Sequence, residues 1–187
     1  MAHPSKTNIR TLAIDPTTNG FGFAVMEGPE SLIDWGVKDA GAGDKNARCL
    51  EIVSALIDHY MPDVLVVEDY RNKGFRRCER VRRLIQDIMK LALKKRVKAR
   101  KFNRSEVREA FSGSGTFTKH GIATTIAERL LELAPRLPPY RHAWMSEDYR
   151  MAIFDAVALA LTFFHFESHK GKDELLALGI NSSNHVQ

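Results

Sequence analysis

The sequence predicts a single α/β domain built on a mixed five-stranded sheet flanked by helices. Short apolar runs bounded by turn residues predict strands at residues 9–15, 21–26, 31–37, 64–67 and 97–102. The first three strands follow one another through short turns, which is typical of an antiparallel meander. A helical pattern precedes each of the last two strands, as a right-handed parallel crossover requires.

Apolar residues at helical spacing account for most of the rest of the chain. Helices are predicted at residues 47–60, 76–96, from 103 with a capping box to Glu106, at 119–133 and at 146–166. A proline-containing surface connection is expected at 134–144. The predicted domain therefore spans residues 9–167, and residues 1–8 and 168–187 are predicted to be polar tails.

Composition excludes several classes of protein. The chain has 187 residues, 44% hydrophobic and 27% charged, which suits one domain with a sizeable core. No apolar run approaches the ~20 residues that a membrane-spanning helix needs. The first ten residues are too short and polar for a signal peptide. Cys49 and Cys78 show no metal-ligand spacing, so we expect reduced cysteines in a cytoplasmic protein.

Positive charge is concentrated in one segment. Residues 71–108 hold 16 Lys or Arg against three acidic residues, a net charge of +13, while the rest of the chain carries −8. Such a concentration predicts a surface that binds a polyanion, most often nucleic acid. The alternative is a solvated helix face that is rich in basic residues.

Two carboxylates stand at the ends of predicted buried strands. Asp15 follows an apolar run and precedes Pro-Thr-Thr-Asn-Gly, and Glu68 ends the run Val-Leu-Val-Val. If these strands are parallel neighbours, the two side chains lie at the same edge of the sheet, ~4.8 Å apart, where they repel unless a cation lies between them. Asp15 could instead serve only as a turn former before Pro16.

A third carboxylate, Asp155, interrupts the apolar pattern of the last predicted helix. A buried carboxylate needs a partner, and either a metal or an arginine such as Arg150 could provide one. Three carboxylates form an all-oxygen site suited to Mg²⁺ or Mn²⁺. Beside a basic surface, such a site predicts two-metal hydrolysis of a phosphodiester.

Four motifs resemble the RuvC-type Holliday-junction resolvases of the ribonuclease H-like superfamily. They are Ala-Ile-Asp15-Pro-Thr-Thr-Asn-Gly-Phe-Gly, Pro62-Asp-Val-Leu-Val-Val-Glu68, Gly113-Ser-Gly-Thr-Phe-Thr-Lys119 and Phe154-Asp155-Ala-Val-Ala-Leu-Ala-Leu. The resemblance implies a ribonuclease H-like fold and Mg²⁺-dependent cleavage of four-way DNA junctions by a homodimer of bacterial or phage type. It makes Asp15, Glu68 and Asp155 the metal ligands and Lys119 a basic catalytic residue.

The chain departs from the family in two ways. Ala152 stands where the family has a further metal ligand one turn before the last aspartate. If both residues belong to one helix, Asp148 lies two turns, ~10 Å, from Asp155, which is too far to replace that ligand simply. The alternative to metal binding is that Glu147 and Asp148 are first-turn acids, which the helix dipole favours. In addition, residues 76–101 form a very basic segment, whereas the corresponding helix of the family helps to form the dimer. These positive charges could instead contact DNA or weaken dimerisation.

The segment after Glu68 supplies the predicted DNA contacts. These residues are Tyr70, Arg71, Lys73, Phe75, Arg76, Arg77 and Arg80. Tyr70 and Phe75 could stack on an unpaired base or simply pack against the protein. Lys119, at the start of a helix where the dipole disfavours it, is expected to contact phosphate or water.

Other functions remain open from the sequence. The same acidic site serves RNA-processing and ribonuclease H-type enzymes. The turn after Asp15 also resembles the phosphate loop of sugar kinases and actin-like ATPases, which need two such domains and a longer chain. The residue at Ala152 leaves a catalytically inactive DNA-binding relative as a further alternative.

Overall fold

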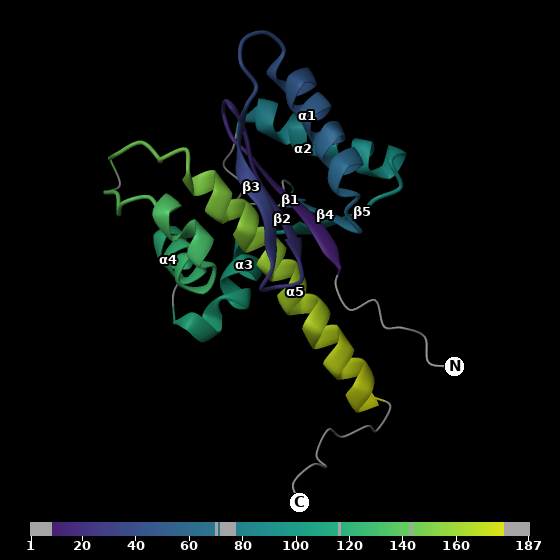
Figure 1. The fold of residues 1–187 in the computed structure, drawn as a ribbon, viewed down its shortest axis with the longest axis vertical. Coiled ribbons are helices and arrows are strands. Elements are labelled where there is room, and N and C mark those ends of the chain that lie inside the picture. The colour runs from purple at the N-terminus through teal and green to yellow at the C-terminus, as the bar shows by residue number, and fades with distance from the viewer. Residues whose placement is uncertain (1–8, 70, 72–77, 116, 143, 178–187) are drawn as a thin grey trace, which may run out of the picture.

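The computed structural model describes residues 9–69, 71, 78–115, 117–142 and 144–177 (Figure 1). Its strands are β1 (Arg10–Pro16), β2 (Gly20–Glu27), β3 (Leu32–Asp39), β4 (Val64–Glu68) and β5 (Lys98–Phe102). Its α-helices are α1 (Lys45–Tyr60), α2 (Glu79–Lys94), α3 (Arg104–Ala110), α4 (Lys119–Arg129) and α5 (Met151–Ala177). Two 3₁₀ helices, Ser112–Ser114 and Leu131–Arg136, complete the described elements.

The five strands form one sheet in the order β3-β2-β1-β4-β5. Strands β1, β2 and β3 pair antiparallel, whereas β4 pairs parallel with both β1 and β5. The predicted mixed sheet is therefore confirmed. Ile14 pairs with Val67 across β1 and β4, so Asp15 and Glu68 follow at the same end of two adjacent strands.

Helices cover both faces of the sheet (Figure 1). Side chains along β1 alternate between the two faces, as the pleat requires. Leu12 and Ile14 join the core beneath α1 and α2, and Ala13 joins the core formed with α3, α4 and α5. This two-sided burial explains why β1 and β4 are almost entirely apolar until they reach their acidic residues.

Helix α5 lies unusually close to β2. A Cβ atom placed on Gly22 would be 2.1 Å from the carbonyl oxygen of Ala152. Only glycine permits this approach, which brings the first turns of α5 against the sheet. Gly22 is also the partner of Asp15 in the β1–β2 register, so the close contact lies beside the end of β1.

By length and composition alone, Met151–Lys170 of α5 could cross a membrane. In the structure, 67% of an 18-residue apolar window within this stretch is buried. Core helices of folded domains share that composition, so the stretch is weak evidence for a membrane span.

Several predicted boundaries were wrong. The last helix begins at Met151 rather than at residue 146, and it continues to Ala177 instead of ending at 166. Asp148 explains the late start: its carboxylate accepts a hydrogen bond from the backbone N–H of Arg150, and its carbonyl accepts one from Met151. The helix predicted at 119–133 ends at Arg129 and is followed by a 3₁₀ helix that contains Pro135.

Candidate active site

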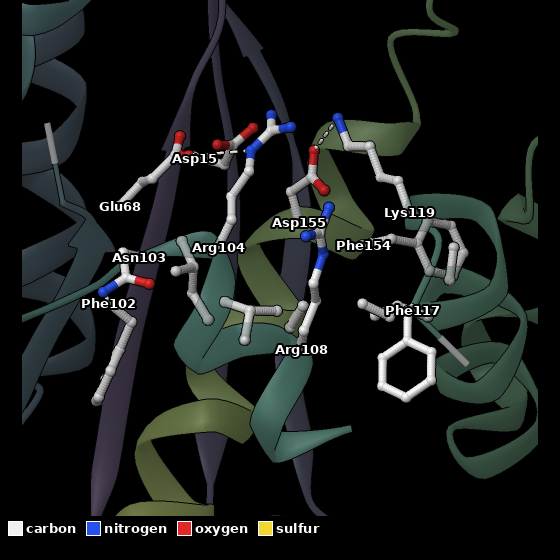
Figure 2. A pocket seen from close by; sticks show the side chains of 15 residues that line it. Asp15, Glu68, Phe102, Asn103, Arg104, Arg108, Phe117, Lys119, Phe154 and Asp155 are labelled. Carbon is white, nitrogen blue, oxygen red and sulfur yellow. Dashed lines mark hydrogen bonds and ion pairs between the residues drawn. The ribbon is translucent and has the colours of Figure 1, made fainter. Parts of the chain in front are cut away.

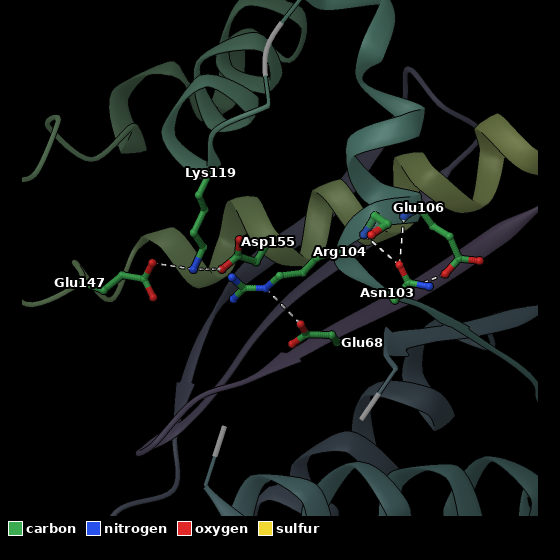
Figure 3. A network of polar contacts seen from close by, with 8 residues as sticks. Glu68, Asn103, Arg104, Glu106, Lys119, Glu147 and Asp155 are labelled. Carbon is green, nitrogen blue, oxygen red and sulfur yellow. Dashed lines mark hydrogen bonds and ion pairs between the residues drawn. The ribbon is translucent and has the colours of Figure 1, made fainter. Parts of the chain in front are cut away.

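Asp15 and Glu68 are buried carboxylates at the end of the two central strands. Their exposed fractions are 2% and 8%. Glu68 Oε1 lies 3.4 Å from Nε of Arg104, which is the first residue of α3 (Figure 3). The end of the sheet therefore carries two desolvated acids with a guanidinium beside them.

Asp155 approaches from α5 and Lys119 from the start of α4. Lys119 Nζ lies 2.6 Å from Asp155 Oδ2 and 2.5 Å from Glu147 Oε1 (Figure 3). Thr118 caps α4 by accepting a hydrogen bond from the N–H of Gly121, which fixes where the lysine side chain leaves the helix. The lysine thus connects an acid on α5 with an acid on the preceding loop.

The ammonium group of Lys119 is held in its charged form. Burial alone would lower the pKa of Lys119, but the charges of Asp155 and Asp15 and hydrogen bonds to Asp155 and Glu147 raise it above its ordinary value. The side chain therefore presents a fixed positive charge among the acids at neutral pH.

All three predicted metal ligands line one pocket, together with Lys119 (Figure 2). The residues come from two strands and a helix that are far apart in the sequence, so the structure shows the spatial convergence on which the site prediction depends. As the side chains are placed, no group of three or more His, Cys, Asp or Glu residues within the described part of the chain is positioned to hold a metal. The cations of Lys119 and Arg104 lie against Asp155 and Glu68 instead.

The region around Ala152 differs from the helical arrangement expected. Ala152 is 4% exposed and lies against Gly22.

Glu147 and Asp148 lie on the loop before α5. The separation of ~10 Å between Asp148 and Asp155, which assumed that both lie on one helix, therefore does not apply. Arg150, which the sequence allowed as an alternative partner of Asp155, forms an ion pair of 2.6 Å with Asp148. Glu147 instead reaches the site through Lys119.

The predicted DNA contacts are only partly described. Tyr70, Lys73, Phe75, Arg76 and Arg77 lie outside the described residues. Arg71 is exposed, and its backbone N–H donates to the Asp69 carboxylate.

Arg80 is engaged with the protein itself. Its guanidinium donates hydrogen bonds to the carbonyl oxygens of Thr17 and Thr18 and to the side chain of Asn46. The acceptors belong to the turn after Asp15 and to α1, so this arginine connects three elements.

Sequence reasoning missed several pocket residues. Arg104 and Arg108 on α3 and Phe117 before α4 line the same pocket as the acids. The capping box that begins α3 contained a usable signal: it places Arg104 in the first turn, and Arg108, four residues on, shares its face. Phe117 carried no comparable signal.

Comparison with known proteins gives matches only at the level of structure. No family model and no curated sequence matches the chain. The fold is similar to that of Thermus thermophilus RuvC, with a TM-score of 0.64 and 16% identity over 87% of this chain and 97% of that one. It is also similar to the yeast mitochondrial Holliday junction resolvase Ydc2, with a TM-score of 0.59 and 11% identity over 88% of this chain and 82% of that one.

A third similar structure is the fowlpox virus Holliday junction resolvase, with a TM-score of 0.51 and 13% identity over 86% of this chain and 99% of that one. The mixed sheet flanked by helices is thus similar in fold to RuvC and to the other resolvase structures. At these identities the likeness establishes the fold.

Proposed function

We propose that this protein is a Mg²⁺-dependent endonuclease that cleaves branched DNA and resolves four-way junctions. The observation that carries the proposal is the convergence of Asp15, Glu68 and Asp155 on one pocket beside Lys119. The fold supports it, because the similar Thermus and fowlpox proteins have structures with Holliday junction DNA.

The donor set fits a hard divalent cation. All three candidate ligands are carboxylates, and two of them are buried at the ends of adjacent strands, where a cation offsets their mutual repulsion. Mg²⁺ fits this donor chemistry, and Mn²⁺ could substitute. Binding requires the side chains of Lys119 and Arg104 to turn away from the acids, which their length allows.

Each residue then has a separate role. Bound divalent ions, two in the mechanism proposed, would activate water and stabilise the leaving oxygen. Asp15, Glu68 and Asp155 hold these ions, and Lys119 offers its fixed charge to the phosphate. Arg104, once released from Glu68, adds a second cation for the same anionic group.

The basic segment 71–108 is the proposed DNA-binding surface. It includes β5 and α2, where Arg82, Arg83 and Lys90 are exposed. Phosphate contacts by such residues predict that binding weakens steeply as salt is raised. We also propose a homodimer, because a resolvase of this type cuts two strands of a junction; sedimentation with and without DNA tests this assembly.

Cleavage assays on a four-way junction, a duplex and an RNA–DNA hybrid test the function, each with and without Mg²⁺. We expect Mg²⁺-dependent cutting of the junction. Asp15→Asn, Glu68→Gln and Asp155→Asn should each lower cleavage by roughly a hundredfold or more while leaving junction binding intact, since loss of even an outer partner of a metal ligand costs about 10–100-fold.

Glu51→Gln is the matched control, because Glu51 is an exposed acid on α1 that pairs with Arg48. It should cut like the wild type. Preference for the hybrid would instead assign a ribonuclease H-type activity, and a wild-type rate in any of the three variants would remove that residue from the site.

Ala152 favours a second candidate, a DNA-binding relative without nuclease activity. No carboxylate occupies this buried position beside Asp155. Tight junction binding with no cleavage in either Mg²⁺ or Mn²⁺ would identify that function.

A further inference from the structure

The pocket that holds the acids continues into an apolar slot. Its carboxylates and Lys119 lie at one end (Figure 2). The rest of the lining is largely hydrophobic and comes from β5, α3, α4, α5 and the loop before α4: Phe102, Val107, Phe117, Ile122, Ala123, Phe154, Ala158 and Leu159. The site is thus asymmetric, with a charged end suited to a phosphate and an apolar end that the proposed hydrolysis does not use.

Two features of the slot are accessible to a ligand. Phe117 is 58% exposed although it lines the pocket, so its side chain is accessible for stacking. Arg108 is exposed and lies on the α3 wall, and no other residue within the described part of the chain forms an ion pair or side-chain hydrogen bond with it. Figure 2 shows its guanidinium directed toward the acidic end.

We propose that the slot takes one unstacked nucleobase of the cleaved DNA strand, next to the phosphate at the acidic end. This inference rests on the proposed function. A nucleotide combines a flat ring with apolar faces and an attached anionic phosphate, which matches the two ends of the site. Stacking on Phe117 would stabilise any base, and Arg108 could pair with the adjoining phosphate.

A strand of DNA is favoured over a free nucleotide by the surrounding charge. The α3 wall belongs to the segment that holds 16 basic and three acidic residues, and such a segment suits many phosphates rather than one. A free deoxynucleoside monophosphate that competes with junction binding at micromolar concentration would instead identify a small-molecule site.

A series of junctions, each with one abasic nucleotide at a different position around the cut, tests the proposal. The cleavage rate of each is compared with that of the intact junction. One position should show a loss of roughly fivefold or more in rate, because stacking of one base on an aromatic ring contributes about 1–3 kcal/mol in typical single-strand complexes. Phe117→Ala should cleave the intact junction and that abasic junction at the same reduced rate. Ile122→Trp, which fills the slot, should do likewise.

Tyr140→Ala is the matched control, since Tyr140 is also an exposed aromatic, at 70%, but does not line the slot. This variant should retain the full difference in cleavage rate between the intact and the abasic junction. Equal wild-type rates on every abasic junction would overturn the nucleobase proposal and leave the proposed function standing.

A binding measurement keeps the inference testable if the protein does not cut. Phe117→Trp places a fluorophore at the slot, and its emission should be quenched when junction DNA binds in Ca²⁺, relative to the wild type with its two native tryptophans. Quenching should fall when the abasic nucleotide occupies the critical position. Unchanged emission with all DNAs, despite binding, would reject the slot as a base site.

Discussion

The guanidinium of Arg80 donates a 2.9 Å hydrogen bond to the carbonyl oxygen of Thr18, three residues after Asp15. It also donates to the carbonyl of Thr17, and Arg80 Nη1 lies 2.7 Å from the side-chain oxygen of Asn46. One side chain at the start of α2 thereby holds the turn that follows the first acidic residue. The sequence suggested a phosphate contact for Arg80, whereas these contacts favour a role in positioning the turn.

We therefore expect Arg80→Ala to impair catalysis more than DNA binding. Releasing the turn should let Asp15 move, so cleavage should fall by roughly 10- to 100-fold, as small misplacements in active sites do. More Mg²⁺ should be needed for half-maximal activity. Junction affinity in Ca²⁺, and its slope against salt, should change little.

Arg83→Ala provides the control for Arg80. Arg83 lies on the same helix and pairs with Glu79, but its side chain is 69% exposed and its removal deletes the same charge. If Arg80→Ala instead reduces the salt slope by about one phosphate contact and leaves the cleavage rate unchanged, Arg80 binds DNA and does not position the turn.

Lys119 and Glu147 should act as a unit in cleavage. Glu147 accepts from Lys119 at 2.5 Å, and the same ammonium group contacts Asp155. Lys119→Met should lower kcat/KM by roughly a hundredfold, as loss of a transition-state charge contact does. Glu147→Gln should cost less, because Lys119 and its charge remain in the site.

The double variant distinguishes this arrangement from independent contributions. Glu147→Gln should have little further effect in the Lys119→Met background, since residues that share a partner are not additive. If the two losses multiply, Glu147 acts without Lys119, for example as a direct metal ligand. Titration of Mn²⁺ binding in each variant would separate those cases.

Gly22→Ala should strongly destabilise the fold. The added methyl group would lie 2.1 Å from the carbonyl oxygen and 2.3 Å from the carbonyl carbon of Ala152, and these backbone atoms cannot move aside as a flexible side chain could. We expect a loss of about 3 kcal/mol in the free energy of unfolding, at the upper end for overpacking. Urea denaturation followed by circular dichroism measures it.

Gly113→Ala is the matched control for Gly22. A Cβ at Gly113 would meet nothing within 4 Å, and its φ does not lie in the left-handed region. Its stability should be close to that of the wild type. A small effect of Gly22→Ala would show that α5 can move away from β2, and that Asp155 is not held beside Asp15 by this contact.

Much of the sheet could be predicted because its signals are local. Apolar runs ended by Asp15 and Glu68 marked two parallel neighbours, and the register between them follows from ordinary strand pairing. The start of α5 could not be placed in the same way. By sequence, Glu147 and Asp148 were expected in the first turn of the helix. In the structure, Asp148 instead accepts hydrogen bonds from the backbone N–H groups of Arg150 and Met151, just before the helix begins.

The contacts of the long side chains were beyond sequence reasoning. Arg80 bonds to carbonyls more than 60 positions away, and nothing in the composition of α2 separates it from its exposed neighbours. Lys119 was expected to contact phosphate or water, and the sequence did not predict its acidic partners, which lie on a loop and on a helix whose start was misplaced. Such pairings depend on tertiary packing, which the local pattern does not encode.

A final prediction concerns the free energy of unfolding at alkaline pH. The Tyr60 hydroxyl, at the end of α1, donates a 2.5 Å hydrogen bond to Asp34 Oδ2 on β3. This hydrogen bond, together with burial and the charge of Asp34, raises the pKa of Tyr60 from 10.0 to about 12. The protonated phenol is therefore favoured in the folded state, and its contribution is complete below about pH 10 and is lost as pH rises toward 12.

Tyr60→Phe should accordingly lower the free energy of unfolding by about 1 to 2 kcal/mol at neutral pH, as loss of one hydrogen bond does at a partly buried site. The variant should lack the wild type's extra loss of stability between pH 10 and 12. Urea denaturation at a series of pH values measures both effects, with Tyr140→Phe as the exposed control. Parallel curves for Tyr60→Phe and the wild type across that range would show that the bond to Asp34 does not stabilise the fold.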